Sequence, residues 1–508
     1  MIYKIKKQMN KITTLLLIFI TVNAIGQQVK KGPYIIEPSN KNIIIRYEFD
    51  VKQDYKIEYG ISKENTKEIN LEYRDTKHNA YLYSANLVDL KPNTTYYYRL
   101  SNVKNSKWTT YKTYKTNQRD FSFAVMGDSR SNPSIFTKIT KLTEEENPDF
   151  IISMGDLVEN GGDYEEWQRF YFDIIKDFAG TVPVVSTLGD HEADGDNGEL
   201  FRYFLRKNET TDKQWFSFDF GDAHFISLDF RFQESDEMIK WFEDDIKKAN
   251  KKWNFVYMHR PSFNYGGHRT AWGQDIWPDL FYKYKVDIVF AGHSHLYERF
   301  YPVKPDNGSD AFAVTYITTG GAGAGLYEAM TNKDILKQSE SVNHFLSIKI
   351  DKNKLSMKAI RMDGSLLDEF TIQKDNKNNK KFSDGNKIIS QEFLKTITSL
   401  NASISHRMNG IPLAQTPIKY DVEMQSYIKT DIPIAIQVSD SSKDTYSIEP
   451  IIDTLPALGE KSISFDILRK KSINVSPWGN LTPKLYVEMI YKIENKTDTV
   501  TGIINYWP

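Results

Sequence analysis

The stretch FSFAVMGDSR, residues 121–130, joins a short run of apolar residues to a glycine, an aspartate and an arginine. Such a run, bounded by turn residues, is typical of a buried strand. Similar runs follow at residues 150–154, 182–188, 255–258 and 286–291. Segments with a helical pattern lie between them, at residues 133–146, 163–178 and 235–249. This alternation of buried strands with helices predicts an α/β layered core.

An aspartate or a histidine comes after each of the five runs. The residues in these positions are Asp128, Asp156, Asp190 with His191, His259, and His293 with His295. Ligands of open α/β sheets bind outside the carboxyl ends of the strands, so these side chains should meet at one site. The glycine before each of the three aspartates lets the backbone turn sharply there. Clustered carboxylates repel one another unless cations are present, and carboxylates mixed with imidazoles suit zinc, manganese or iron.

These five blocks, in this order, resemble the calcineurin-like metallophosphoesterase superfamily. With a β-sandwich in front of them, they are most similar to the purple acid phosphatase type of architecture. The resemblance covers residues 30–372 and leaves the carboxy-terminal part of the chain outside. It implies a layered α-β-β-α central domain and a hydrolase that cleaves phosphate esters with two metal ions.

The resemblance also implies a role for each residue in the blocks. His191 matches the histidine that assists catalysis, and the glycine-rich loop at residues 319–324 resembles one that these phosphatases carry beside the site. The two metals would be divalent or mixed-valence transition ions: iron, manganese or zinc. The residues that would bind them are Asp128 and His295 for the first ion, Asp190, His259 and His293 for the second, and Asp156 as a bridge.

Three residues depart from the family pattern. Arg130 stands where the first block commonly has a histidine, so the first metal would have fewer protein ligands. Glu159 replaces the tyrosine that gives purple acid phosphatases their colour, so we do not expect a purple protein. Asp190 replaces an asparagine and adds negative charge at the second metal. Arg130 is either a guanidinium fork for the substrate phosphate or half of a structural ion pair.

The implied reaction is hydrolysis of a phosphomonoester by attack of a metal-bound hydroxide, with His191 stabilising the transition state or protonating the leaving group. A phosphodiesterase or nucleotide hydrolase would use the same metals and differ at the pocket rim. A protein of another class, a surface-binding module with a degenerate metal site, is suggested by the three departures. The substrate would be a small phosphorylated molecule, and the sequence leaves the oligomeric state open.

Length and local patterns divide the rest of the chain. With 508 residues, about three domains are expected. Alternating short runs at residues 30–116 predict a β-sandwich, and the segment LKPNTTYYYR, residues 90–99, resembles a strand of fibronectin type III domains. The predicted parts are a signal peptide at 1–26, the fibronectin-like sandwich at 27–117, the catalytic domain at 118–373, a linker at 374–387, and a β-rich, sandwich-like domain of unknown role at 388–508.

The N-terminus and the composition point to an exported protein. Several lysines precede an apolar stretch at residues 12–22, and the small residues Ala24 and Gly26 follow, which is typical of a signal peptide with a periplasmic or secreted destination. The apolar stretch is too short for a transmembrane anchor. The chain has no cysteine and therefore no disulfide. Because 66 Lys and Arg nearly balance 67 Asp and Glu, no surface for nucleic acid is evident.

Other histidines and tryptophans are more often structural. His224 falls within a strand pattern and is interpreted as a packed strand residue. His268 and His344 either line the cleft or pack within the fold, and packing is the preferred interpretation. Trp215, Trp272 and Trp277 are either walls of a pocket or core residues, and core packing is the default.

Overall fold

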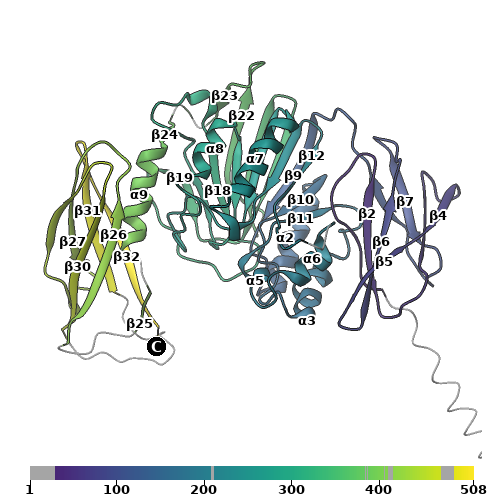
Figure 1. Ribbon diagram of the computed structural model, residues 1–508, viewed down its shortest axis with the longest axis horizontal. Helices are drawn as coiled ribbons and strands as arrows, with labels where there is room; N and C mark the ends of the chain where they lie inside the picture. Colours follow the sequence, from purple (N-terminus) through teal and green to yellow (C-terminus); the bar gives the residue numbers. More distant parts are fainter. Residues whose placement is uncertain are drawn as a thin grey trace, which may run out of the picture.

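The computed structural model describes residues 29–207, 211–383, 385, 387–404, 407–409, 416–470 and 485–507. The predicted signal peptide at 1–26 lies outside these residues. Along the described chain, an N-terminal sandwich is followed by a central domain of sheets and helices and then by a second strand-rich domain (Figure 1). This is the multidomain fold class that the sequence predicts.

The N-terminal sandwich consists of two four-stranded antiparallel sheets, with the orders β1-β2-β6-β5 and β4-β3-β7-β8. Alternate residues of the tyrosine-rich strand β7, Tyr96, Tyr98 and Leu100, are buried in the core between the sheets. The strands are β1 Val29–Ile35, β2 Ile43–Phe49, β3 Lys56–Gly60, β4 Thr66–Asn70, β5 Glu72–Lys77, β6 Ala80–Leu87, β7 Thr95–Leu100 and β8 Thr109–Lys112.

Two seven-stranded sheets pack against each other in the central domain, with the orders β11-β10-β9-β20-β21-β22-β23 and β12-β13-β14-β15-β18-β16-β19. Phe123, Phe150, Phe225 and Phe255 are fully buried between the two sheets. The first sheet comprises β9 Asp120–Met126, β10 Phe150–Ser153, β11 Val184–Ser186, β20 His344–Asp351, β21 Lys354–Arg361, β22 Leu366–Lys374 and β23 Lys380–Phe382. The second comprises β12 Phe216–Phe220, β13 Ala223–Ser227, β14 Trp253–Met258, β15 Ile288–Ala291, β16 Tyr297–Phe300, β18 Thr315–Thr319 and β19 Leu336–Glu340.

Helices cover the outer faces of these sheets, which gives the layered arrangement that the sequence predicts (Figure 1). Helix α2 (Pro133–Glu145) begins at Asn132, whose side chain accepts from the backbone N–H of Ile135. Helix α7 (Asp236–Ala249) begins in the same way at Ser235. The other helical segments are α3 Tyr164–Glu166, the π-helical η1 Trp167–Phe172, α4 Asp173–Ile175, α5 Asp190–Ala193, α6 Glu199–Leu205, η2 Phe230–Phe232, α8 Trp277–Lys283 and η3 Asp310–Phe312.

Buried polar contacts fix the N-terminal sandwich on the central domain. The guanidinium of Arg46 donates to the carbonyls of Tyr203 and Phe204, at 2.7 and 2.8 Å. Lys31 and Glu48 form an ion pair of 2.5 Å with no exposed side-chain surface, and the hydroxyl of Tyr164 donates to the same carboxylate. Tyr203 and Phe204 belong to α6 (Glu199–Leu205), so this helix joins the sandwich to the central domain.

The polar stretch at residues 374–387 is predicted as a linker from the sequence, but part of it forms a strand in the structure. Its first part belongs to the first sheet, because β23 pairs with β22 in an antiparallel hairpin. Lys374 and Lys380 are buried there, with their ammonium groups 2.7 and 3.4 Å from the carboxylate of buried Asp287. The two lysines therefore belong to a buried charge cluster. Composition alone does not distinguish such lysines from the solvated lysines of a linker.

The C-terminal domain begins with helix α9 (Gln391–Ser403), which lies between the central domain and the C-terminal strands (Figure 1). One sheet has the order β25-β32-β31-β27-β29 and another β26-β30-β28, while β17 and β24 pair where the two domains meet. The elements are β17 Val303–Lys304, β24 Ile389–Ser390, β25 Arg407–Asn409, β26 Ile418–Gln425, β27 Ile432–Val438, β28 Tyr446–Ser447, β29 Ile451–Leu455, β30 Glu460–Arg469, β31 Leu485–Ile493 and β32 Lys496–Trp507.

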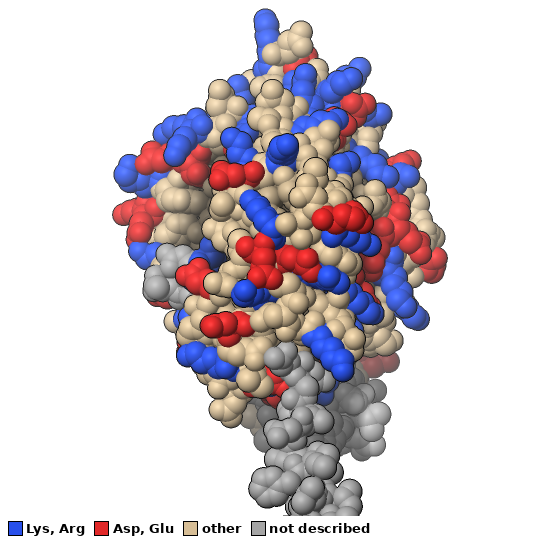
Figure 2. All heavy atoms as spheres, turned by 90° about the vertical axis from the view of Figure 1, so that its right-hand side faces the viewer, with Lys and Arg blue, Asp and Glu red and all other residues tan. Residues whose placement is uncertain are grey.

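The charge distribution on one face of the molecule agrees with the near-equal numbers of basic and acidic residues. On the face formed by the N-terminal sandwich, basic and acidic side chains are interspersed and no single-sign patch dominates (Figure 2). Within the described ranges, no helix is both long and apolar enough to cross a membrane.

Candidate metal centre

The ends of five central strands bring the predicted ligands together. Strands β9, β10 and β11 run parallel in the first sheet, and β14 and β15 run parallel in the second. Parallel strands end at the same edge of a sheet. Asp128, Asp156 and Asp190 therefore leave the first sheet beside His259 and His293, which leave the second.

The backbone is left-handed at three of these positions. The angle φ is 58° at Asp128, 54° at Asp156 and 67° at His293. Residues other than glycine rarely adopt this conformation, and such strain is concentrated at functional sites. The neighbouring Gly292 is required for a different reason, because a Cβ there would lie 2.5 Å from Oδ2 of Asp128.

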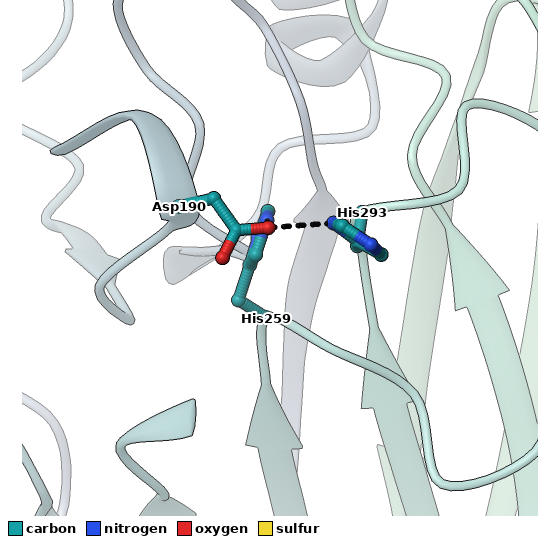
Figure 3. Close-up of side chains that lie close together, drawn as sticks. All are labelled: Asp190, His259 and His293. Atoms are coloured by element: carbon teal, nitrogen blue, oxygen red, sulfur yellow. Dashed lines mark ion pairs between the residues drawn. The ribbon is translucent and has the colours of Figure 1, made fainter. Parts of the chain in front are cut away.

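One group of potential ligands is formed by Asp190, His259 and His293 (Figure 3). Nδ1 of His293 lies 2.7 Å from Oδ2 of Asp190, and Nε2 of His259 lies 3.4 Å from the same oxygen. The ligand atoms of the three residues all lie within 4.8 Å of one another. These are the three residues assigned to the second metal by the family resemblance.

A second group consists of Asp128, Asp156 and His259, again with ligand atoms within 4.8 Å. Nε2 of His295 lies 3.5 Å from Oδ1 of Asp128, and Nε2 of His191 lies 3.9 Å from Oδ2 of Asp156. Because His259 belongs to both groups and its Nε2 lies 3.3 Å from Oδ1 of Asp156, the structure brings all six predicted ligands and His191 to one site.

Backbone carbonyls orient the imidazole rings. Nδ1 of His259 contacts the carbonyl of Met154 at 2.7 Å, and Nδ1 of His295 contacts the carbonyl of Gly325 at the same distance. With Nδ1 as the donor, Nε2 is turned toward the carboxylates. Nε2 of His259 is buried and makes no hydrogen bond within the described part of the chain, although Asp156 is 3.3 Å away. An unsatisfied ring nitrogen among carboxylates fits a bound cation.

Glu192 is a supporting residue to which the sequence analysis assigned no role. Its fully buried carboxylate accepts from the backbone N–H groups of Gly189, Asp156 and Leu157, at 2.9, 2.8 and 2.6 Å. Burial and the nearby charge of Asp156 raise its pKa to about 8. Glu192 thus fixes the turn after β10 against the turn after β11. Its position directly after His191 is the sequence feature that could have indicated this role.

Two of the three departures from the family pattern are partners of each other. Nη1 of Arg130 lies 2.7 Å from Oε2 of Glu159, and its Nε lies 3.4 Å from Oδ2 of Asp156. The structure therefore contains the ion pair that was one of the two interpretations of Arg130.

The third departure also has a basic partner. Both carboxylate oxygens of Asp190 face Arg260, whose Nε lies 2.9 and 3.2 Å away and whose Nη2 lies 2.8 Å from Oδ1. Arg260 follows His259 directly and was not singled out from the sequence. Its guanidinium offsets the charge that Asp190 adds in place of asparagine.

The histidines set aside from the sequence divide into two kinds. His224 is buried between Asp219 and Asp245, and His344 is buried beside Thr319 with its pKa lowered by burial to about 4. His268, in contrast, is exposed and stacks on His293 with ring centroids 4.2 Å apart. Nothing in the sequence near His268 indicates that contact.

The three tryptophans considered from the sequence pack in the fold. Trp272 and Trp277 are buried and stack on each other, and Trp215 is partly buried against the core.

The charges within the site alter its proton affinities. Burial alone would raise the pKa of Asp190, but the neighbouring rings of His259 and His293 lower it below its ordinary range. Burial alone would lower the pKa of His259, but the charges of Asp156 and Asp190 raise it to about 10. Burial, together with the charge of His259, lowers the pKa of His293. The metal-free site therefore keeps a proton on His259 at neutral pH.

Comparisons with known proteins agree with this geometry. Residues 121–297 match the family model described as Calcineurin-like phosphoesterase. Acid phosphatase type 7 of Mus musculus is 26% identical over 258 residues, which cover 44% of this chain and 58% of that protein. Purple acid phosphatase 1 of Ipomoea batatas is 28% identical over 293 residues, which cover 50% of this chain and 61% of that protein. The chain thus spans about three fifths of the length of these relatives.

A solved structure is similar over a larger part of the chain. The purple acid phosphatase isolated from yellow lupin (Lupinus luteus) seeds aligns with a TM-score of 0.60 and 20% identity, covering 70% of this chain and 76% of that one. At this identity the likeness establishes a shared fold.

We expect metal binding to release a proton, because His259, with its pKa raised to about 10, must lose its proton before Nε2 can bind a cation. Affinity for Zn²⁺ or Mn²⁺ should therefore rise about tenfold per pH unit for each proton released, between about pH 6 and pH 8. Calorimetric titration in buffers of different ionisation enthalpy measures this release. His78→Ala, at an exposed position of the N-terminal sandwich, is the matched control. Affinity that is independent of pH would contradict the expectation.

Proposed function

We propose that this chain, whose residues 121–297 form a calcineurin-like phosphoesterase domain with acid phosphatase relatives, is a hydrolase that cleaves phosphate monoesters with two metal ions. The observation that carries the proposal is the environment of His259. Its buried Nε2 makes no hydrogen bond within the described ranges, yet it lies 3.3 Å from Asp156 and 3.4 Å from Asp190. This arrangement suits a cation far better than it suits packing.

The donor set fits transition metals. Carboxylate oxygens with imidazole nitrogens favour iron, manganese or zinc over magnesium or calcium. When bound, two such ions would activate a water molecule and neutralise charge on the phosphate oxygens. Following the family resemblance, we assign Asp128, Asp156 and His295 to the first ion, and Asp156, Asp190, His259 and His293 to the second.

His191 is suited to proton transfer at the leaving group. Its Nδ1 contacts the carbonyl of Glu159 at 2.6 Å, which fixes the ring. Nε2 points toward Asp156, and the side chain is 29% exposed, so a substrate can reach it. A protonated ring donates from Nε2 to the departing oxygen, and the carbonyl of Glu159 keeps the ring in place.

Basic groups near the carboxylates supply contacts for the phosphate. Arg130 is 14% exposed, and a phosphate that takes the place of Glu159 would meet its guanidinium fork. His268 stacks on His293 and is exposed. We assign both residues to the binding of the substrate.

The reconstituted protein should hydrolyse an aryl phosphate monoester. Asp156→Asn and His191→Ala should each lower kcat at least about 100-fold, because one changes the carboxylate proposed to bridge both ions and the other removes the proton donor. Steady-state kinetics after separate loading with manganese, zinc and iron measure this.

Matched controls are Asp120→Asn and His78→Ala, both at exposed positions away from the site. A preference for the corresponding diester would transfer the assignment to a phosphodiesterase or nucleotide hydrolase. Absence of turnover with every metal would refute the enzyme and leave a binding protein on a degenerate site.

Export is the second part of the proposal, and it rests on the lysines and the apolar stretch before residue 27. Expression of the full gene in a bacterial host should yield a mature chain beginning at Gln27 outside the cytoplasm. N-terminal sequencing of the periplasmic and culture fractions tests this. A protein that keeps its first residues and stays in the cytoplasm would overturn it.

A further inference from the structure

A single loop of the central domain connects the metal centre with the C-terminal domain. We call residues 264–275, which lie between β14 and α8, the rim loop. It carries His268 and Arg269 side by side. His268 is exposed at the candidate metal centre, whereas Arg269 is 9% exposed and contacts the C-terminal domain. Adjacent residues of the loop therefore serve two different domains.

The inner side of the rim loop is held against the block that contains two predicted ligands. The ring of His268 stacks on that of His293, and its backbone N–H donates to Oγ of Ser294 at 3.1 Å. Oγ of Ser294 donates in turn to Oδ1 of Asn264 at 2.6 Å. Gly267 permits this approach, because a Cβ there would lie 2.8 Å from the same Oγ.

The outer side of the rim loop is held by α9 and β32. Nη1 of Arg269 donates to the carbonyl of Asn401 at 2.7 Å, and Nη2 donates to the carbonyl of Thr501 at 3.3 Å. Nδ2 of Asn401 donates back to the carbonyl of Tyr265 at 2.6 Å. Helix α9 and this loop thus exchange hydrogen bonds in both directions.

The environment of Arg269 is energetically unfavourable for a charged guanidinium. Within the part of the chain that the structure describes, its hydrogen-bond acceptors are two backbone carbonyls and the sulfur of Met330. Burial lowers its pKa to about 10. Its φ of 55° adds backbone strain. A buried charge without a hydrogen-bonded carboxylate costs stability, which argues for a role in placing the loop.

We propose that the C-terminal domain is a positioning element for the metal centre, with Arg269 and Asn401 as the positioning residues that hold the rim loop and keep His268 against His293. The holding of the loop is independent of the reaction. The contribution of His268 to turnover rests on the proposed function. Arg269 acts through His268 and has no contact with the reacting atoms.

The first test measures amide hydrogen exchange in the full-length chain. In Arg269→Met, exchange of peptides covering residues 264–275 should rise by about tenfold or more, while peptides of β14 and β15 stay protected. Asn401→Ala should give a change in the same direction. Glu392→Ala is the matched control: it removes another contact of α9 with the central domain, to the N–H of Asp306, and should leave the loop unchanged. An unchanged loop, or exchange that rises equally in the central strands, would overturn the proposal.

The second test is a double-mutant cycle with an aryl phosphate. Arg269→Met should lower kcat/KM by about 10- to 100-fold in the otherwise natural chain. In the His268→Ala background the same substitution should cost less than about threefold, because the loop then has no ring to position. Equal losses in both backgrounds would show a merely structural role.

The two tests separate the two proposals. If the natural chain hydrolyses no phosphate ester with any metal, the proposed function fails, and hydrogen exchange alone decides whether the C-terminal domain holds the rim loop. If the chain is active and the cycle is additive, the proposed function stands and the positioning role is wrong.

Discussion

Three aspartates at the end of one sheet face three histidines at the end of the other, and the central domain is arranged around this cluster. Asp128, Asp156 and His259 are almost completely buried. Groups of this kind are tolerated inside a protein only when they are paired or share a cation. The backbone is left-handed at both aspartates, and the buried carboxylate of Glu192 fixes the turn at Asp156, so the fold concentrates strain and burial at this site.

The departures from the family pattern are compensated within the same chain. Arg130 and Glu159 pair with each other, and Arg260 pairs with Asp190. Each substitution that changes charge therefore has a partner of opposite charge in contact with it. A decaying site would be expected to accumulate unpaired charges. The pairing favours a site that has kept its electrostatic balance while changing its residues.

The sequence predicted the layered fold and the convergence of these side chains, because the signal lay in the aspartate or histidine directly after each buried run. It did not predict which residues pair across distant segments, such as Arg130 with Glu159 or Arg269 with Asn401. The residues next to Arg130 or Arg269 in the sequence do not indicate the partner of either side chain. The assignment of residues 374–387 as a linker differed for a related reason. Lys374 and Lys380 resemble solvated residues until Asp287, on another segment, is seen beside them.

The most direct measurement is anomalous diffraction from crystals of the full chain reconstituted with manganese or zinc. Two peaks about 3.5–4 Å apart are expected, one beside Asp190, His259 and His293 and the other beside Asp128 and His295, with Asp156 between them. A single peak, or none at these residues after reconstitution, would contradict a two-metal centre built from the ends of the two sheets.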